Sequence, residues 1–539
     1  MLNVFKNLRA ANFGSTHKNA PAHACWMHRF SADQTGSMSY VAVAGSLIMM
    51  VFGGIGIDLI HAELQRNKVQ NTLDRAVLAA ANLDHETDPQ SMVEEYFRAM
   101  GMSDALDDVT VEDRLNYKSV TAEGSLQMQA NFLGLLGVDT LQALGAATAE
   151  HGLNKIEVSL VLDISGSMSG AKLTQMKDAA NTFVDLMLGP DAGGLTTVSV
   201  VPYNATVNMG DILAAQYTLE DYQGYSNCAT FAPADYNSTA VDPDEELAKI
   251  AHFDPYSTST SSTSISRPWC QTGQTAAIMA HSSDADALKA HIASLTAGGN
   301  TAIDLGMKWG AALLDPSAQP VVSALAADGH VDGSLGIRPA AYSDGETLKF
   351  VVVMTDGQNT TQYDLKSSKK AGLSDIWIDE RNNSNANDDR FSVRVSSNSY
   401  YQLRRDRYRS SPDGGSRARQ MTYAEVYARF GTRAVASKFY YEPYRDGRVS
   451  YNTYRDYYYG YQATVDGNLA DSQLSNVCRA ARDNSIVVYA IGVEAPQRGL
   501  DAMHDCASSP AHYFDVTGSE LEETFNAIAR SLQQLRLTQ

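Results

Sequence analysis

Residues 155–170 read KIEVSLVLDISGSMSG, an apolar run followed by a loop rich in oxygen-bearing side chains. An apolar run of this kind is typical of a strand that is buried on both faces of a parallel sheet. Asp163, Ser165 and Ser167 come directly after it on a tight loop. Three side-chain oxygens are therefore expected at the carboxyl end of a buried strand.

The residues after this loop complete a strand–loop–helix–strand unit. Residues 171–188 place apolar side chains along one helical face, namely Leu173, Met176, Ala180, Phe183 and Met187. Residues 196–205, TTVSVVPYNA, predict a second strand. This unit predicts an α/β fold with a doubly wound, mostly parallel sheet flanked by helices. The same alternation resumes later, with helices over 284–295 and 470–483, strands over 348–355, 485–493 and 512–516, and a final helix from Ser519.

Two further loops are expected to bring oxygen atoms to the same edge of the sheet. Asp356 lies at the carboxyl end of the strand over 348–355, and Thr301, in AGGNTAID, opens a helix. Ligands of open α/β sheets bind where the carboxyl ends of the strands meet. The predicted ligands of a metal ion are Asp163, Ser165, Ser167, Thr301 and Asp356.

An oxygen-only set suits a hard divalent cation, Mg²⁺ first, with Ca²⁺ or Mn²⁺ as alternatives. Water or the carboxylate of a partner would complete the coordination. The alternative is local: Asp163 caps the turn and the two serines cap the following helix. That alternative accounts for the loop after the first strand. It does not explain why three separate loops carry oxygen-bearing side chains at the same edge of the sheet.

Residues 38–57, MSYVAVAGSLIMMVFGGIGI, form a strongly apolar run without charge. The uncharged stretch 34–57 is long enough to cross the roughly 30 Å hydrocarbon layer of a membrane as a helix. Basic residues exceed acidic ones before it, which predicts a cytoplasmic N-terminus and a main domain outside the membrane. A cleaved signal would be shorter and end in small residues, and a soluble core helix would show a polar face. We therefore expect an uncleaved, single-pass anchor.

The chain of 539 residues is too long for one ordinary core. We expect a basic segment at 1–34, the anchor at 35–59, and a helical stalk with a small β-containing segment at 60–150. The α/β domain would occupy 151–539, with insertions at about 205–280 and 380–462. The formal charge of −20 argues against nucleic-acid binding, which needs a basic surface to replace phosphate counterions.

The three loops together resemble a von Willebrand factor A (VWA) domain. Asp163-x-Ser165-x-Ser167, Thr301 and Asp356 match, in order, the D-x-S-x-S, Thr and Asp elements of its metal-ion-dependent adhesion site (MIDAS). The resemblance implies that the two serines ligate the cation directly and that Thr301 does so in some states. It also implies that both aspartates bind mostly through water.

The layout as a whole resembles TadG-like proteins of the Tad (Flp) pilus systems of bacteria. The shared features are a basic N-terminus, one transmembrane helix, the segment LQRNKVQNTLDRAVLAAANL at 64–83, and a C-terminal VWA domain that closes with DCASSPAHYFDV. Asn71 and Arg75 depart from the family pattern. The resemblance implies a single-pass protein of the bacterial inner membrane, with a periplasmic or extracellular main domain, that acts in pilus assembly or adhesion.

Five cysteines divide around the apolar run, with Cys25 before it and four after it. Disulfides persist in the oxidising space outside a bacterial membrane. Cys478, on a helix, and Cys506, on a loop two elements later, flank one strand and are the first predicted pair. Cys228 and Cys270 are the second, closing the insertion after the second strand. The alternative is four buried free thiols, and the spacing does not support a zinc site.

Residues 382–461 are crowded with tyrosine and arginine. Both residue types are enriched in protein interfaces, because they supply a large contact area with few rotatable bonds and several hydrogen-bond donors. We hypothesise a partner-binding insertion near the metal face, the alternative being a loop packed on its own domain. The candidate contact residues are Tyr400, Tyr401, Arg404, Arg405, Tyr440, Tyr441, Tyr457, Tyr458 and Tyr459.

The sequence leaves three functions to compare. The first is an anchored adhesion or assembly module, not an enzyme, whose cation holds a carboxylate of a protein ligand such as a pilin or another pilus-assembly component. The second is a metal-dependent hydrolase, although the sequence contains no GxSxG, HExxH or P-loop motif. Serine and threonine ligands also leave a metal electrophilic, which favours capture of a carboxylate. The third is a VWA protein of another surface or stress system, unrelated to pili.

Overall fold

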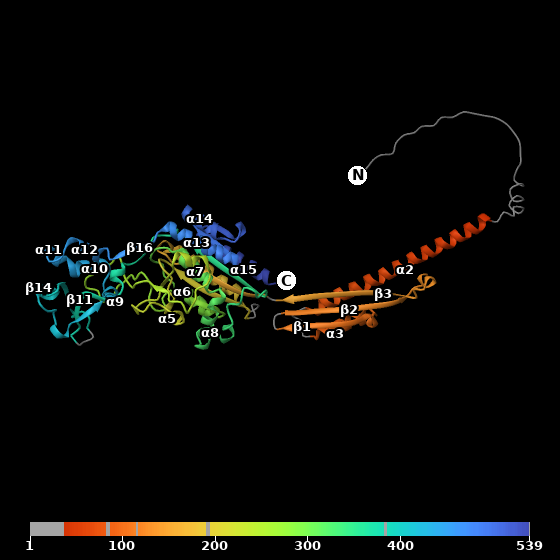
Figure 1. Cartoon of the computed structure of the whole chain (residues 1–539), viewed down its shortest axis with the longest axis horizontal. Coiled ribbons are helices and arrows are strands. Elements are labelled where there is room, and N and C mark those ends of the chain that lie inside the picture. Colours follow the sequence, from red (N-terminus) through yellow and green to blue (C-terminus); the bar gives the residue numbers. More distant parts are fainter. Residues whose placement is uncertain are drawn as a thin grey trace, which may run out of the picture. The chain divides into compact units, whose positions relative to one another are not determined.

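The computed structural model describes residues 37–81, 87–114, 117–152, 154–189, 194–381 and 385–537. The chain divides into two compact units, residues 1–151 and residues 152–539 (Figure 1). The predicted basic segment 1–34 and Cys25 lie outside the described residues.

The first unit contains a long helix and a small sheet. Helix α2 (Ser37–Ala80) is continuous, so the apolar run and the segment after it form one helix. It is followed by α3 (Pro89–Ala99) and by a three-stranded sheet in the order β1 (Leu106–Arg114), β2 (Tyr117–Gln129) and β3 (Thr140–Gly152). Figure 1 shows the sheet alongside α2.

The two halves of α2 have different surroundings. The first half exposes large apolar side chains such as Met49 and Phe52, whereas the second half buries Val69, Leu73 and Val77 in the core of this unit. Among the described residues, α2 is the one helix long and apolar enough to span a bilayer. One continuous helix therefore combines an exposed apolar half with a half that belongs to a folded core.

The second unit is built on a six-stranded sheet in the order β18-β17-β9-β4-β5-β8. Neighbouring strands are parallel from β18 to β5, and β8 is antiparallel to β5. The strands are β4 (Lys155–Asp163), β5 (Thr196–Tyr203), β8 (Met279–Ser282), β9 (Thr347–Thr355), β17 (Val487–Val493) and β18 (Tyr513–Val516). The central strands are buried almost throughout, as their apolar runs predict.

Helices pack on this sheet through two separate hydrophobic cores. One core joins the sheet to α4 (Ala171–Met187), α6 (Ala285–Ser294) and α15 (Leu521–Leu537). The other joins it to α7 (Ile303–Ala312), α8 (Gln319–Ala327), α13 (Gly467–Asp483) and α14 (Gln497–Cys506). The prediction of an α/β domain with one long apolar N-terminal helix is confirmed, and the sheet is mixed because of β8.

Two insertions share a third core. The first, after β5, contains α5 (Gly210–Ala214), β6 (Ala229–Thr230) and β7 (Ala248–Lys249). The second contains a five-stranded sheet and several short helices, grouped at one end of the unit in Figure 1. Its elements are β11 (Leu373–Asp379), β12 (Arg390–Ser396), β13 (Ser399–Gln402), β14 (Arg407–Arg409), β15 (Arg419–Thr422), α9 (Tyr423–Arg429), α10 (Thr432–Val435), α11 (Tyr441–Arg445) and α12 (Tyr451–Tyr458).

The second insertion begins earlier than the sequence suggests. Strand β10 (Gln362–Leu365) pairs with β16 (Tyr461–Val465), and this antiparallel ladder closes the base of the insertion. The excursion therefore begins after Leu365 rather than near residue 380. Across the shared core, Trp269 of the first insertion packs edge-on against Tyr363 with ring centroids 5.5 Å apart, and Thr432 N donates to Asp254 O.

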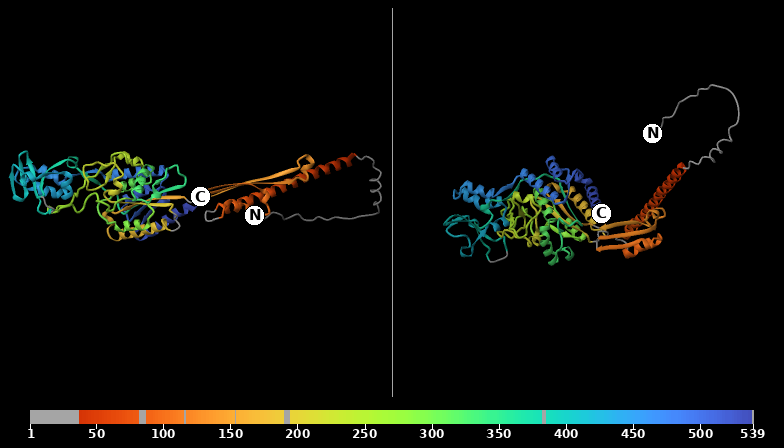
Figure 2. Two further views of the ribbon diagram at one scale, coloured as in Figure 1. Left: turned by 90° about the horizontal axis from the view of Figure 1, so that it is seen from below. Right: turned by 45° about the vertical axis from the view of Figure 1, so that its right-hand side comes forward.

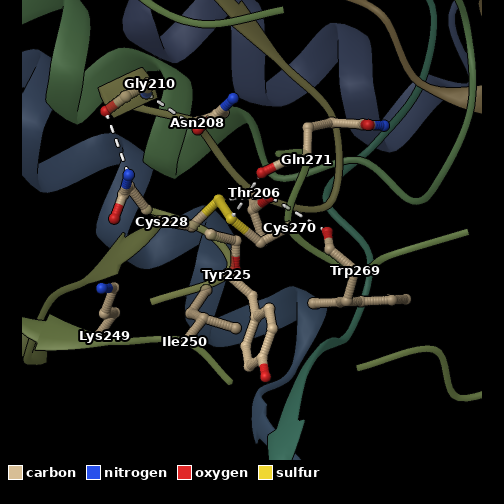
Figure 3. Close-up of a disulfide and its surroundings, with 12 residues drawn as sticks. Thr206, Asn208, Gly210, Tyr225, Cys228, Lys249, Ile250, Trp269, Cys270 and Gln271 are labelled. Carbon is tan, nitrogen blue, oxygen red and sulfur yellow. Dashed lines mark hydrogen bonds between the residues drawn. A yellow bond between two sulfur atoms is a disulfide. The ribbon is translucent and has the colours of Figure 1, made fainter. Parts of the chain in front are cut away.

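Both predicted disulfides are present. Cys228 is bonded to Cys270, and Cys478 to Cys506. The first lies in the shared core of the insertions, next to Thr206, whose hydroxyl donates to Trp269 O (Figure 3). The second joins α13 to α14 on one face of the main sheet.

Removing the Cys478–Cys506 bond is expected to destabilise the second unit. The bond closes a loop with a sequence separation of 28 residues. A loop of this length is expected to contribute about 3.5 kcal/mol by restricting the unfolded chain. Urea unfolding of Cys478→Ser/Cys506→Ser without reductant measures this loss. Ser472→Ala, on the exposed side of α13, is the matched control, and equal midpoints for the two variants would contradict the prediction.

Candidate metal centre

The loop after β4 is organised by Asp163. This residue ends the buried strand, and its carboxylate accepts a hydrogen bond from Ser165 N (2.7 Å) at Oδ1 and from the Thr355 hydroxyl (2.7 Å) at Oδ2. The first contact folds the loop back on itself, and the second joins it to the end of β9. Asp163 is thereby fixed by two neighbouring strands of the sheet.

The loop before α7 packs directly on the loop after β4. Gly166 N donates to Gly299 O (3.0 Å), and Gly298 N donates to Ile164 O (2.9 Å). A Cβ at position 166 would lie 3.2 Å from Gly299 O, a tight contact that glycine avoids. Gly299 itself has a φ of 87°, in the region that glycine favours. The glycines thus set the spacing between the two loops.

The loop after β9 completes the cluster. Thr360 N donates to Thr301 O, and Thr301 N donates to the Thr360 hydroxyl (3.1 Å). A Cβ built on Gly357 would lie 3.4 Å from Thr301 Oγ1 and 3.8 Å from Ser167 Oγ, which places both hydroxyls around that glycine. Three loops, far apart in the sequence, therefore meet at the carboxyl ends of β4 and β9.

The Ser167 hydroxyl contacts two other side-chain oxygens of the cluster. Ser167 Oγ donates to Asp356 Oδ1 at 2.6 Å, and Ser165 Oγ lies 3.1 Å from Ser167 Oγ. Asp163, Ser165, Thr301 and Asp356 are buried, whereas Ser167 is exposed. The structure brings all five predicted residues together, with Ser167 on the side open to solvent.

The electrostatics of the cluster are dominated by two buried carboxyl groups. Burial raises the pKa of the Asp163 carboxyl to about 6, although hydrogen bonds from Thr355 and Ser165 oppose this shift and nearby Asp356 adds to it. The hydrogen-bond donors to Asp163 are neutral. Asp356, by contrast, has a cationic neighbour: Lys172 Nζ lies 3.0 Å from its Oδ2 and 3.5 Å from Glu494 Oε2.

The residues present fit a hard divalent cation. Two carboxyl groups and three hydroxyls supply only oxygen atoms, and Asp163 is a buried acid whose ionised form a nearby cation would stabilise. Among the described residues, no group of three or more His, Cys, Asp and Glu side chains is arranged so that it could hold a metal ion. A cation site here would therefore depend on the serine and threonine hydroxyls as well as on the carboxylates.

Three residues of the centre are absent from the sequence-based prediction. Thr355 holds Asp163, Lys172 pairs with Asp356, and Asn204 links the loop before α7 to the end of β5 by donating to Gly298 O (2.8 Å). Thr355 and Asn204 lie at the carboxyl ends of predicted strands, so strand position could have indicated them. Lys172 lies in the first turn of α4, and its sequence context gives no sign of its partner.

The predicted tyrosine and arginine contacts divide into buried and exposed residues. Tyr401, Tyr440 and Tyr457 are buried in the shared core, so their assignment to a partner surface is corrected. Their rings supply the apolar area that this small subdomain needs for a core. Arg404 and Arg405 lie near the buried carboxylate of Asp413 (3.9 and 3.2 Å).

The remaining predicted residues are accessible to different degrees. Tyr400 and Tyr458 are partly buried, and Tyr441 and Tyr459 are exposed. Tyr444 and Tyr451, which the sequence-based prediction omits, are also exposed and lie with their ring centroids 5.6 Å apart. We call Tyr441, Tyr444, Tyr451 and Tyr459 the tyrosine surface.

A family model matches the N-terminal part of the chain. Residues 36–83 match the Tad family, described as "Putative Flp pilus-assembly TadE/G-like". The match covers the whole of α2, including the apolar run. No curated protein matches the chain.

Several solved structures are similar to the chain at low identity. The VWF domain of the type V pili tip protein Mfa5 from Porphyromonas gingivalis is 14% identical, with 72% of this chain and 97% of that chain covered and a TM-score of 0.32. The adhesive tip pilin GBS104 of Group B Streptococcus agalactiae is 11% identical over 70% of this chain and 99% of that chain, with a TM-score of 0.29. Proximal thread matrix protein 1 from the mussel byssus, solved with a zinc-occupied MIDAS motif, is 12% identical over 71% of this chain and 46% of that chain, with a TM-score of 0.25.

Proposed function

We propose that this protein is a membrane-anchored adhesion or assembly module whose second unit is a VWA domain that binds a divalent cation and, through it, a protein ligand. One observation carries the proposal. Three loops that lie far apart in the sequence bring Asp163, Ser165, Ser167, Thr301 and Asp356 together at the carboxyl edge of the sheet. Local capping by Asp163 and the serines would not require the Thr301 and Asp356 loops to meet there.

The side chains would divide the work as follows. Ser165, Ser167 and Thr301 would offer hydroxyl oxygens to the cation, and Asp163 and Asp356 would supply negative charge, directly or through water. The cation, Mg²⁺ or alternatively Ca²⁺ or Mn²⁺, would supply an electrophilic site for an external carboxylate. Exposed Ser167 marks the side from which such a carboxylate could approach.

The membrane and pilus parts of the proposal rest on α2. Its apolar first half would span the inner membrane of a bacterium, with the N-terminus in the cytoplasm and the second unit in the periplasm or outside the cell. The family match over 36–83 supports a role in the assembly of Flp-type pili, with a pilin or another pilus component as the ligand. We propose a binding role without catalysis and without nucleic acid.

The proposal is tested by capture of a pilin. The full chain, reconstituted in nanodiscs and freed of metal with EDTA, is titrated with Mg²⁺ and then incubated with purified Flp pilin from the same bacterium. We expect saturable Mg²⁺ binding, and pilin capture that requires Mg²⁺ and is reversed by EDTA. Equal capture with and without EDTA, or turnover of a substrate that depends on the metal, would contradict the proposal.

Lys172 is expected to weaken cation binding. Its ammonium group lies 3.0 Å from Asp356 Oδ2 and would compete with a divalent cation for that carboxylate. Because Lys172 is partly exposed, we expect the repulsion to amount to about 1 kcal/mol, so that Lys172→Gln would tighten Mg²⁺ binding about fivefold. Isothermal titration calorimetry measures this change.

Lys177→Gln is the matched control for that measurement. Lys177 lies on the same helix, but its Nζ donates to Ala293 O, away from the cluster. Its substitution should leave the Mg²⁺ affinity unchanged. Weaker binding in Lys172→Gln would show instead that the lysine supports the site.

A second contact with the ligand is proposed on the tyrosine surface. The exposed rings of Tyr441, Tyr444, Tyr451 and Tyr459 lie on or next to α11 and α12, and the Arg455 guanidinium lies 5.8 Å from the Tyr459 ring centroid. Exposed aromatic rings beside arginine are typical of interface hot spots. This observation supports a protein-binding role for the second insertion.

Removal of three of these rings is expected to weaken ligand binding. Tyr441→Ala/Tyr451→Ala/Tyr459→Ala should raise the Kd for the pilin about 30-fold, since a hot spot contributes at least about 2 kcal/mol. Surface plasmon resonance at constant Mg²⁺ measures the change. Tyr225→Ala, an exposed tyrosine of the first insertion, is the control. An unchanged Kd for the triple variant would exclude the tyrosine surface while leaving the cation site in place.

A further inference from the structure

The hairpin between β2 and β3 ends in an apolar turn. Residues 130–138, ANFLGLLGV, contain no charged side chain. The turn includes a 3₁₀ segment, Leu133–Leu136, and is closed by Gly137 with a φ of 88°. Leu135 and Leu136 are 71% and 63% exposed. Turns are normally built from polar residues and glycine, so a cluster of exposed leucines at a turn indicates a contact surface.

This turn is attached to the anchor helix. The Asp58 carboxylate accepts hydrogen bonds from the backbone N–H groups of Asn131 (3.3 Å), Phe132 (2.6 Å) and Leu133 (2.8 Å). The Phe132 ring covers Gly54, where an added Cβ would fall 2.2 Å from the ring. Figures 1 and 2 show the hairpin reaching along α2. The position of the turn along the helix is therefore fixed.

The contact lies within the apolar part of α2. Asp58 is the first charged residue after the apolar run, and Gly54 lies three residues before the end of that run at Ile57. At a rise of 1.5 Å per residue, the contact of Phe132 with Gly54 lies on the order of 5 Å along the helix axis from the end of the apolar run at Ile57. A shallow groove between helix and turn is lined by apolar residues that include Met49, Met50 and Phe132.

The bonding of the turn suits an apolar medium. Three of its backbone N–H groups are already bonded to Asp58, and the desolvation of backbone groups is the main obstacle to placing a loop in lipid. Phe132 of the turn lines the same groove as the exposed Met49 and Met50 of α2, so the apolar surface of the helix continues onto the turn. Because neither surface carries charge, lipid acyl chains fit it better than anionic headgroups do.

We propose that the turn at residues 130–138 is a second membrane contact, which inserts Phe132, Leu135, Leu136 and Val138 into the outer leaflet beside the anchor helix. This inference rests on the proposed membrane-spanning role of α2. A single helix could tilt and rotate in the bilayer together with the sheet packed on it, whereas a second insertion point would hold the three-stranded sheet in one orientation at the membrane surface.

The experiment reads the environment of the turn directly. The full chain with Cys25→Ser and Leu135→Cys is labelled without reductant by the environment-sensitive fluorophore NBD and reconstituted in phosphatidylcholine nanodiscs. Two reference positions are labelled in the same way: Ile48→Cys in the middle of the apolar run, and Glu123→Cys on an exposed site of β2. The fluorescence of each of the three labelled variants is then measured with two quenchers, lipids that carry a spin label on the acyl chain and aqueous iodide.

The expected result is a blue-shifted emission at position 135 that the lipid spin label quenches and iodide does not, with the opposite behaviour at position 123. Quenching by lipid at 48 together with quenching by iodide at 135 would overturn the inference and leave the anchor intact. Quenching by iodide at position 48 would overturn both the membrane contact of the turn and the membrane-spanning role of α2. Energy transfer between differently labelled copies at 135, without quenching by lipid, would assign the turn to a second copy and also overturn the lipid contact.

Discussion

Asp163→Asn is expected to remove most of the stabilisation that Mg²⁺ gives to the second unit. The substitution keeps the shape of the side chain: its amide oxygen can still accept from Ser165 N, and its NH2 group would donate to the Thr355 hydroxyl instead of accepting from it. The substitution removes the negative charge from the centre of the cluster. Loss of such a group is expected to weaken the affinity for Mg²⁺ about 100-fold. At a Mg²⁺ concentration 100 times the wild-type Kd, ligand-induced stabilisation would then fall from about 2.7 to about 0.4 kcal/mol.

Thermal unfolding with Mg²⁺ and with EDTA measures this difference. Burial raises the pKa of the Asp163 carboxyl to about 6, so the ionised carboxylate that predominates near neutral pH costs folding free energy when no cation is bound. Asp163→Asn should therefore be at least as stable as wild type in EDTA. The control is Asp178→Asn, an exposed aspartate on α4 that should keep the full response to Mg²⁺. A wild-type response in Asp163→Asn would refute the assignment of this centre.

Glu157→Gln is expected to cause the largest loss of stability without any effect of metal. Glu157 lies on β4, is fully buried, and pairs with Arg338 (3.0 Å) and Lys349 (2.6 Å), both of which are also buried. Removing the carboxylate charge leaves two cations inside the protein without a counterion. Breaking a buried ion pair in this way costs about 3–5 kcal/mol.

Urea unfolding checks this value against a surface pair. Glu346→Gln removes a partly exposed partner of Lys155 (3.4 Å) and should cost less than about 1 kcal/mol. Adding Lys349→Met to Glu157→Gln should recover part of the loss, because one uncompensated charge is then removed. If Glu157→Gln lowers the free energy of unfolding no more than Glu346→Gln does, the buried ion pairs of Glu157 do not stabilise the fold as their geometry indicates.

Much of the second unit could be predicted from local patterns. The apolar runs that became β4 and β9 are long enough to identify as buried strands, and the oxygen-bearing loops follow them directly. Strand order brings the loop ends to one edge, so the meeting of Asp163 with the Asp356 loop followed from topology. Both disulfide pairings followed from the same arrangement of elements.

The features that could not be predicted depend on contacts between distant residues. Lys172 and Asp356 are 184 residues apart, and nothing local marks the lysine as a partner. Tyr401, Tyr440 and Tyr457 have the composition of an interface but are buried, because a small subdomain uses the same large rings to build a core. The contact of Asp58 with the β2–β3 turn likewise joins residues more than seventy positions apart.

The shared core of the two insertions has a consequence for engineering and for evolution. Phe253 and Trp269 come from the first excursion, and Tyr427 and Phe430 from the second, yet they pack as one cluster. Deleting residues 366–460 alone would expose the apolar side chains of the first insertion to solvent. Any loss of ligand binding in that variant would then reflect misfolding. The portable building block is the pair of excursions together, so the two would have to be grafted, deleted or inherited as a single cassette.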